Sequence, residues 1–275
     1  MTVWICKACG VEYPESEAPP TQCRICSDER QYVPRSGQAW TTLAELAAVG
    51  TRIVIAEEEP QLYAVTASPP VGIGQRSLLL QTDAGNILWD PVGYVDEAGA
   101  AAVLALGPVV AIVASHPHMY GVQVEWSRAL GGVPVLVAAA DAEWVQRSDD
   151  SITVMGAADT ELVPGVTLRT LGGHFPGSFV LHWAAGAEGR GVMFAGDTFF
   201  PLQDGKWVGF LRSYPNMLPL SGAVVDRVAT EALASRFDRV YGNLGGSIPL
   251  DGAAVVRRSA DRHIAWVRGD FDHLT

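Results

Sequence analysis

The stretch Ser115-His116-Pro117-His118-Met119-Tyr120-Gly121 directly follows the apolar run VVAIVA. An apolar run without alternation is typical of a strand covered on both faces, so the histidines lie where such a strand ends. Histidines two positions apart on an extended segment point to the same side, and Pro117 between them stiffens the backbone. Because neutral imidazole is a common metal ligand, this stretch predicts half of a metal site.

Around this stretch, strands and helices alternate, with hairpins mixed in. The patterns predict strands at residues 52–59, 62–67, 77–82, 84–90, 109–115, 133–139, 152–155, 166–171, 178–184, 191–197 and 239–243. They predict helices at residues 39–50, 96–106, 121–131, 221–237 and 253–269. The order predicts an α/β fold with two mixed sheets sandwiched between helices and site residues on loops at strand ends.

All four cysteines lie near the start of the chain, in two Cys-x-x-Cys pairs: Cys6, Cys9, Cys23 and Cys26. Each pair folds two thiolates onto one tight turn, and two turns complete a tetrahedral site for zinc or iron. Redox dithiols or idle thiols are the alternative reading. Residues 1–36 are poor in aliphatic side chains and need a metal for stability, so we expect a metal-binding module at 1–36 and a larger domain at 37–275.

Composition narrows the class of protein. The chain has 275 residues, 48% of them hydrophobic, which allows a substantial core. Its net charge of −11 disfavours nucleic-acid binding, which needs clustered Lys and Arg. The sequence contains no run of about 18 apolar residues, so no membrane span is expected. The N-terminus shows no secretory signal. We therefore expect a cytoplasmic protein that binds neither nucleic acid nor a membrane.

The cysteine stretch WICKACGVEYPESEAPPTQCRIC resembles the rubredoxin-like and zinc-ribbon modules, which carry an aromatic residue before the first pair and Gly plus Tyr after it. Such modules hold zinc or iron. The resemblance implies zinc in a structural or docking role, with iron and electron transfer as the minority alternative.

Three further stretches occur in a fixed order: SHPHMYG, GGHFPGS around His174, and FAGDTFF around Asp197. Their order and spacing over roughly residues 51–265 resemble the metallo-β-lactamase superfamily. The resemblance implies an αββα sandwich in which His116, His118 and His174 bind a metal. Asp197 is then a fourth ligand or the base that orients the water, and Asp90 is the family's early structural Asp.

The sequence also departs from the family pattern. Tyr120 stands where the family has an Asp, Gly121 where it has a His, and Asn243 where it has its late His. Those three family residues are ligands of the second metal, so the resemblance implies that only one metal site remains. Tyr120 either fills the space a metal once held or donates a hydrogen bond to a substrate oxyanion. Asn243 is a neutral hydrogen-bonding group near the site.

One metal suffices for hydrolysis, because three neutral imidazoles leave a divalent ion its full charge and an open position. Such an ion, zinc first and iron or manganese as alternatives, lowers the pKa of bound water toward ~7 and supplies metal-bound hydroxide. Asp90 is expected to hold a ligand or loop by hydrogen bonds, or else to be a plain turn residue before Pro91.

The leading hypothesis is a mononuclear metallohydrolase acting on an ester, thioester, amide or phosphoester. The alternatives are a non-catalytic metal-binding protein that docks a partner through the cysteine module, and an iron redox protein related to flavodiiron reductases. The aromatic segment at residues 199–220 has no clear period and predicts an irregular loop that lines the site, or an interface with a second subunit of a homodimer.

Overall fold

The computed structural model describes the whole chain, Met1–Thr275, which divides into two compact units, Met1–Gly156 and Ala157–Thr275. The cysteine-rich residues at the start of the chain belong to the first unit. The expected boundary between residues 36 and 37 stays a prediction.

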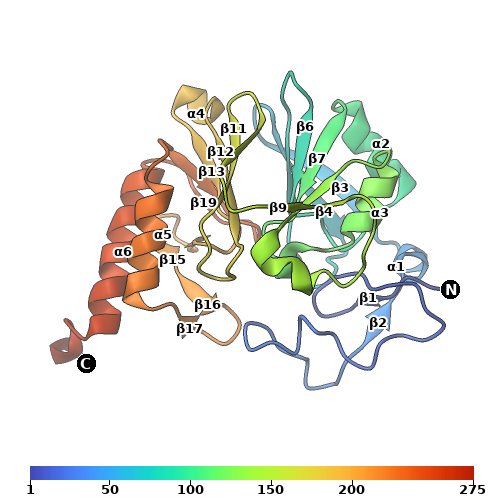
Figure 1. Cartoon of the computed structure of the whole chain (residues 1–275), viewed down its shortest axis with the longest axis horizontal. Helices are drawn as coiled ribbons and strands as arrows, with labels where there is room; N and C mark the ends of the chain where they lie inside the picture. The colour runs from blue at the N-terminus through green and yellow to red at the C-terminus, as the bar shows by residue number, and fades with distance from the viewer. The chain divides into compact units, whose positions relative to one another are not determined.

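The first unit contains a seven-stranded mixed sheet with the order β3-β4-β5-β6-β7-β8-β9 (Figure 1). Neighbours are antiparallel from β3 to β6 and parallel from β6 to β9. The strands are β3 (Arg52–Glu59), β4 (Leu62–Ser68), β5 (Ser77–Leu80), β6 (Asn86–Trp89), β7 (Val109–Val113), β8 (Val135–Ala138) and β9 (Ile152–Met155). Every residue of β5, β6 and β8 is buried. The apolar run of β7, expected to be covered on both faces, is buried except at Val110, which is 37% exposed.

The helices α2 and α3 of this unit lie within the residue ranges that the sequence predicts. They are α1 (Leu43–Ala48), α2 (Glu97–Ala105) and α3 (Gln123–Ala129), with the 3₁₀ turns η1 (Pro117–Met119) and η2 (Ala139–Trp144). The Asp96 side chain caps α2 by accepting from the Gly99 N–H. A Cβ at Gly99 would lie 2.4 Å from the Cβ of Ile53. The bare glycine therefore lets α2 pack closely on β3.

A two-stranded sheet ties the cysteine-rich segment to the chain that follows it. Its strands β1 (Ile5–Cys6) and β2 (Trp40–Thr41) are antiparallel, with Cys6 opposite Trp40. The expected helix at residues 39–50 is therefore shorter, because its first residues pair as a strand. The helix α1 starts after Thr42, whose side chain accepts from the Glu45 N–H at 3.1 Å and so caps the helix.

The second unit contains a six-stranded mixed sheet with the order β10-β11-β12-β13-β18-β19. The pair β13–β18 is parallel, and the other neighbours are antiparallel. The strands are β10 (Thr160–Val163), β11 (Val166–Thr170), β12 (Phe179–Trp183), β13 (Val192–Phe194), β18 (Arg239–Tyr241) and β19 (Ser247–Ile248).

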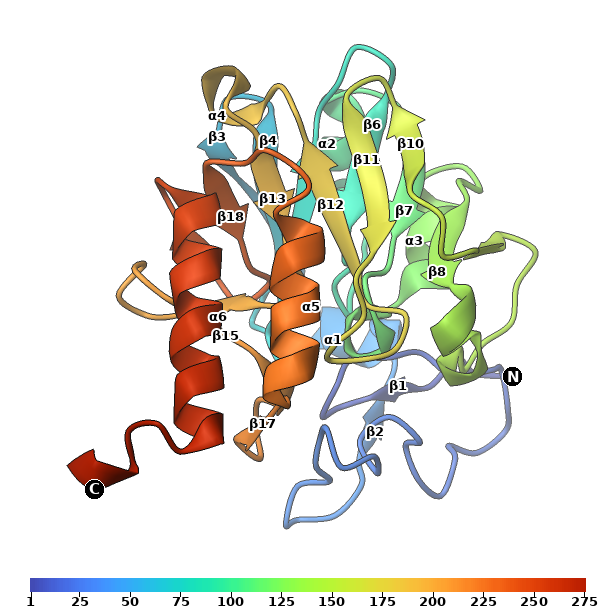
Figure 2. The same ribbon diagram turned by 60° about the vertical axis from the view of Figure 1, so that its left-hand side comes forward.

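Two amphipathic helices, α5 (Gly222–Ala232) and α6 (Gly252–Arg268), lie side by side against this sheet (Figure 2). Ser221 caps α5 by accepting from the Val224 N–H, and α6 ends at Gly269 with a left-handed φ of 85°. Their apolar faces form one core with Val180, Met193 and Val240 of the sheet. The unit also has a short helix α4 (Gly186–Gly189) and a terminal turn η3 (Asp272–Leu274).

The aromatic segment expected to be an irregular loop instead forms two short hairpins. They pair β14 (Phe200–Pro201) with β15 (Val208–Gly209), and β16 (Leu211–Ser213) with β17 (Leu218–Pro219). Phe199 and Phe210 are fully buried in the core of the unit. Strands of two or three residues are too short to display a sequence period, which explains the wrong expectation.

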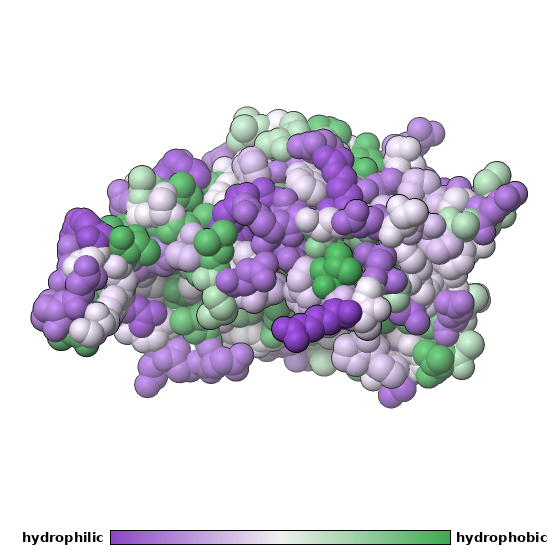
Figure 3. Space-filling view, turned by 90° about the horizontal axis from the view of Figure 1, so that it is seen from below, coloured by the Kyte–Doolittle hydropathy of each residue, from purple (hydrophilic) through white to green (hydrophobic).

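One face of the molecule is mainly hydrophilic. In Figure 3, hydrophilic residues spread over the face seen from below, with apolar residues in small groups among them. No helix of the chain combines the length and the apolar character needed to cross a bilayer.

Candidate metal sites

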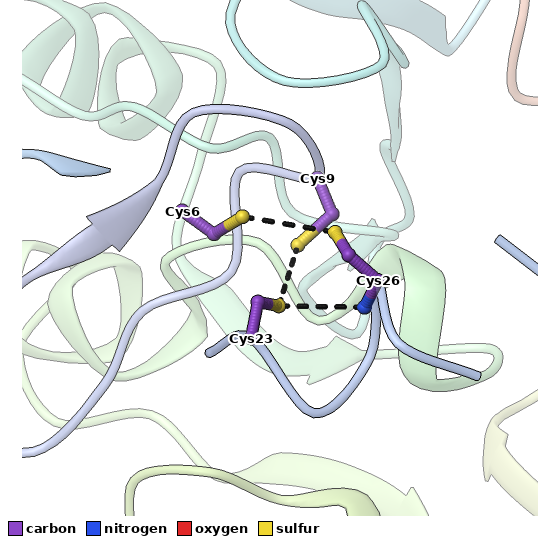
Figure 4. A group of neighbouring side chains, drawn as sticks. All are labelled: Cys6, Cys9, Cys23 and Cys26. Carbon is purple, nitrogen blue, oxygen red and sulfur yellow. Dashed lines mark hydrogen bonds between the residues drawn. The ribbon is translucent and has the colours of Figure 1, made fainter. Parts of the chain in front are cut away.

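The four cysteines form one compact, buried cluster in which all sulfur atoms lie within 4.8 Å of one another. The Sγ atoms of Cys6 and Cys26 are 3.7 Å apart, as are those of Cys9 and Cys23 (Figure 4). Four thiolates at zinc's usual bond length would be separated by roughly 3.8 Å in a tetrahedron. The cluster therefore has the spacing of a four-thiolate metal site, as the paired Cys-x-x-Cys motifs predict.

Donors around the cluster point at sulfur. The Tyr13 hydroxyl donates to Cys23 Sγ at 3.2 Å, and Gln38 Nε2 donates to Cys6 Sγ at 3.2 Å. Hydrogen bonds with the other cluster sulfurs, mainly that of Cys23, and burial raise the pKa of Cys9. Hydrogen bonds with the other cluster sulfurs, again mainly that of Cys23, lower the pKa of Cys6. A buried group of thiolates needs a cation to balance its charge. Zinc and iron both fit this donor set.

The first histidine pair lies just beyond the end of β7, where the sequence predicts it, but His118 lies in the 3₁₀ turn η1 and not on an extended segment as expected. His116 and His118 are each 1% exposed, and their ring centroids are 5.3 Å apart. The carboxylate of Asp90, which follows β6, accepts from the Ser115 N–H at 2.7 Å and from the Ser115 hydroxyl at 2.9 Å. Asp90 is fully buried with φ of 56°, so these hydrogen bonds hold a backbone conformation that non-glycine residues rarely adopt.

This network selects one tautomer of His116. Ser115 Oγ lies 2.9 Å from His116 Nδ1, and its single proton is donated to Asp90. The hydroxyl must then accept from Nδ1–H, which leaves the lone pair on Nε2 of His116. Metal-ligating histidines commonly hold their second nitrogen in this way. The contacts fit the supporting role expected of Asp90, and they act through Ser115.

Replacing Ser115 by alanine is expected to weaken metal binding at the histidine segment by about 10- to 100-fold, because the His116 tautomer loses its acceptor. Competition with a zinc-sensitive chelator measures this affinity. Ser151→Ala serves as the matched control, since the Ser151 hydroxyl bonds to Asp149 away from the histidines. An unchanged affinity in Ser115→Ala would show that the hydroxyl does not set the tautomer.

The remaining predicted ligands, His174 and Asp197, meet in the second unit. His174 lies in the loop between β11 and β12, and Asp197 follows β13. His174 Nδ1 is 3.1 Å from the Leu211 carbonyl oxygen, to which it donates. Its lone pair is then on Nε2, which lies 3.8 Å from Asp197 Oδ2. His174 is 1% and Asp197 6% exposed, so both offer buried donor atoms.

Tyr214 supports the same loop. Its hydroxyl lies 3.2 Å from the Asp197 carbonyl oxygen and 3.2 Å from that of Gly209. Its ring centroid lies 5.6 Å from that of His174. Burial and the negative charge of Asp197 raise the pKa of Tyr214 well above its usual value. The tyrosine therefore stays neutral and acts as a donor and packing surface next to Asp197.

Positions 120 and 121 differ from the family pattern for a spatial reason. Tyr120 is 1% exposed, and its hydroxyl donates to the Asp141 carbonyl oxygen at 3.1 Å. This contact favours the space-filling alternative over an oxyanion donor, and burial raises the pKa of Tyr120. Gly121 has φ of 50°, and a Cβ there would lie 2.1 Å from the Pro91 carbonyl oxygen. The backbone at position 121 therefore has no room for a histidine.

The other polar candidates have simpler surroundings. Asn243 is fully buried in the loop after β18, and its role near the site stays a prediction. His182 Nε2 lies 2.8 Å from the Arg236 carbonyl oxygen, and His263 Nε2 lies 2.8 Å from the Leu220 carbonyl oxygen. These two histidines, in β12 and α6, are therefore bonded to backbone acceptors of the second unit.

Sequence reasoning did not assign a role to Ser115, to the Leu211 carbonyl group or to Glu12. The Ser next to the first His of the motif carried a detectable signal, because a hydroxyl beside a ligand is a typical partner of its second nitrogen. A backbone carbonyl carries no residue-specific signal. Glu12 makes contacts with residues more than a hundred positions away, which no local pattern reveals.

Comparisons with known proteins agree with this picture. A family model described as the metallo-beta-lactamase superfamily matches residues 72–238. A Bacillus subtilis (strain 168) protein described as "Uncharacterized protein YmaE" is 37% identical over 274 residues, covering 99% of this chain and 100% of that protein. The alignment with this relative therefore spans the N-terminal segment as well as the rest of the chain.

Solved structures show the same fold at low identity. The DIM-1 metallo-beta-lactamase aligns with a TM-score of 0.56 at 13% identity, over 78% of this chain and 98% of that one. A metallo-beta-lactamase from Pontibacter korlensis aligns with a TM-score of 0.56 at 16% identity, over 77% and 99%. The FIM-1 enzyme from Pseudomonas aeruginosa, in a mono-zinc form, aligns with a TM-score of 0.53 at 14% identity, over 76% and 95%. The predicted fold class, mixed sheets with helices and an N-terminal four-cysteine module, is confirmed.

Proposed function

This chain belongs to the metallo-beta-lactamase superfamily, and on that premise we propose that it is a hydrolase with one divalent metal ion, zinc, at its active site. The proposed ligands all follow strand ends: His116, His118, His174 and Asp197. The substrate is a small molecule with an ester, thioester, amide or phosphoester bond. A second zinc ion at the four cysteines is proposed to be structural.

One observation carries the proposal. His116 and His174 each have their Nδ1 hydrogen-bonded to a protein oxygen, so that Nε2 bears the lone pair in both. His182 and His263 instead use Nε2 as the donor to a backbone carbonyl oxygen. An imidazole whose Nδ1 is held by a protein oxygen and whose Nε2 lone pair lies beside another predicted ligand is suited to bind a metal.

The case for one ion comes from the residues that replace the second set of family ligands. Tyr120 donates its proton to a backbone oxygen, and Gly121 has no space for any side chain. Asn243 offers a neutral amide, which is a weak ligand for zinc compared with imidazole or thiolate. These replacements favour a mononuclear site.

A divalent ion held by these ligands supplies a Lewis acid and makes hydroxide available near neutral pH. The protein's own residues do the rest. Asp90 and Ser115 keep His116 in its binding tautomer. The Asp197 carboxylate lies 3.8 Å from His174 Nε2, where it completes the ligand set or accepts the proton of the attacking water. Burial of these groups excludes bulk water and strengthens their electrostatic interactions.

Metal analysis with turnover assays tests this function. We expect about two zinc ions per chain, and hydrolysis of at least one substrate in a panel of p-nitrophenyl esters, thioesters, lactones and bis-p-nitrophenyl phosphate. In protein stripped with a chelator and reloaded stepwise, activity should rise only with the second equivalent, because the cysteine cluster binds the first.

Other results would point elsewhere. One ion per chain and no turnover on the whole panel would favour a non-catalytic protein that docks a partner. Visible absorption from iron–thiolate bonds, with no turnover, would favour a redox role. Three ions per chain would contradict the mononuclear site.

A further inference from the structure

Glu12 joins the cysteine module to the segment that follows the histidines. It lies three residues after Cys9 and is 2% exposed. Its N–H donates to the Gly121 carbonyl oxygen at 3.0 Å. Its Oε1 accepts from the Val124 N–H at 2.6 Å. One module residue thus holds both ends of the tetrapeptide from Gly121 to Val124, which begins three residues after His118.

The second carboxylate oxygen of Glu12 is also held. Arg147 Nη1 donates to Glu12 Oε2 at 2.5 Å and to Glu125 Oε1 at 2.6 Å, and Arg147 is only 6% exposed. Glu15, the other nearby acid, lies 3.9 Å from Arg147. Burial raises the pKa of Glu12 to about 7, while Arg147 and the Val124 N–H oppose that rise. The contacts are charge-assisted and strongest when Glu12 is ionised.

The first cysteine turn, at Cys9 and Gly10, also packs against the loop that carries Asp90. Gly93, three residues after Asp90, has no room for a side chain: a Cβ there would lie 2.9 Å from the Gly10 Cα. A Cβ at Gly72 would lie 2.6 Å from the Cys9 carbonyl carbon. The turn at Cys9 and Gly10 therefore packs backbone against backbone on the segments around Gly72 and Gly93 in the same unit.

We propose that Glu12 is a positioning residue that couples the four-cysteine site to the histidine segment, so that metal binding at the cysteines strengthens metal binding at His116 and His118. The proposal rests on the metal-binding role proposed for these histidines. A metal at the cysteines fixes the turn from Cys6 to Cys9, and Glu12 transmits that fixed position to Gly121 and Val124. Because coupling between two sites is reciprocal, histidine-site occupancy also strengthens the cysteine site.

Two variants test the coupling in different ways. Glu12→Gln keeps the size of the side chain but places a neutral amide against Arg147. The amide cannot balance the positive charge of the Arg147 guanidinium. Gly93→Ala changes no charge and forces a methyl group between the Asp90 loop and the cysteine turn. Glu15→Gln is the matched control, since Glu15 is exposed and belongs to the same module.

The measurements are zinc affinity at the histidine site, with the cysteine site loaded, and amide hydrogen exchange over residues 116–124. We expect both test variants to weaken zinc binding about tenfold or more and to speed exchange, while Glu15→Gln behaves like the wild type. Stripping the cysteine metal from the wild type should speed the same exchange. If Glu12→Gln does not fold, Gly93→Ala and the stripped wild type decide.

The outcomes separate this proposal from the proposed function. Unchanged affinity and exchange in the test variants, or equal losses in Glu15→Gln, would overturn the coupling and leave the hydrolase intact. A wild type that binds no second zinc would refute the mononuclear hydrolase. Exchange over residues 116–124 would still report whether the cysteine metal holds that segment.

Discussion

Replacing His116 by alanine is expected to abolish turnover and to remove one of the two metal ions per chain while the four-cysteine site stays loaded. His116 is the ligand whose tautomer is fixed through Ser115 and Asp90. Its loss removes one imidazole from the proposed ligands of the ion. It also removes the Nδ1–H partner of the Ser115 hydroxyl, which stays bonded to Asp90. Turnover on the reactive substrate and elemental zinc analysis of the same preparation check both parts of the prediction.

The control is His273→Ala, which removes an exposed histidine from the terminal turn η3. It should keep two zinc ions and full activity. Circular dichroism of His116→Ala should match the wild type, since most of the buried core of the first unit lies elsewhere. Turnover that survives in His116→Ala would rule out the proposed ligand set, whatever the metal content.

The cysteine cluster could be predicted from the sequence because its information is local. Each Cys-x-x-Cys pair determines a turn, and two pairs suffice for a tetrahedron. The structure places all four sulfurs within 4.8 Å of one another. The structure at residues 40–41 was harder to predict, because β2 pairs Trp40 with Cys6 although its sequence resembles the start of a helix.

The histidine motif was also local, but the reasons for its departures were not. The sequence shows that Gly121 stands where the family has histidine; it cannot show that the Pro91 carbonyl oxygen would lie 2.1 Å from a Cβ there. Likewise the sequence allows two roles for Tyr120, to fill space or to donate to a substrate. The hydrogen bond from its hydroxyl to the Asp141 carbonyl oxygen favours the first. Both answers depend on loops brought together only by the fold.

The largest gap lies in long-range polar contacts. The Glu12 carboxylate accepts from Val124 and Arg147, which are 112 and 135 positions away in the sequence. From the sequence, an individual Glu in a short polar module would be expected to be exposed to solvent. Periodicity predicts which face of an element is buried. It gives no partner for a buried charge, because that partner can come from any element packed nearby.

Replacing Cys9 by serine is expected to cost the module its metal and its fold. Cys9 is fully buried, and a serine hydroxyl is a poor zinc ligand compared with thiolate. Structural zinc contributes apparent binding free energies on the order of 10 kcal/mol in small modules, and residues 1–41 have only the short strands β1 and β2 of their own. After a chelator challenge the variant should retain no zinc at the cysteines.

Limited proteolysis reads the fold of the module directly. Cleavage within residues 1–41 should be much faster in Cys9→Ser than in the wild type. Lys7→Ala, a change at an exposed position in the same turn, should resist cleavage as the wild type does. Because the turn at Cys9 packs on Gly72 and its neighbour Gly10 on Gly93, its unfolding also exposes the backbone beside the Asp90 loop. A Cys9→Ser protein that keeps its metal and resists protease would mean that three thiolates and the packing against the rest of the first unit suffice, and that the complete cluster is not the module's main source of stability.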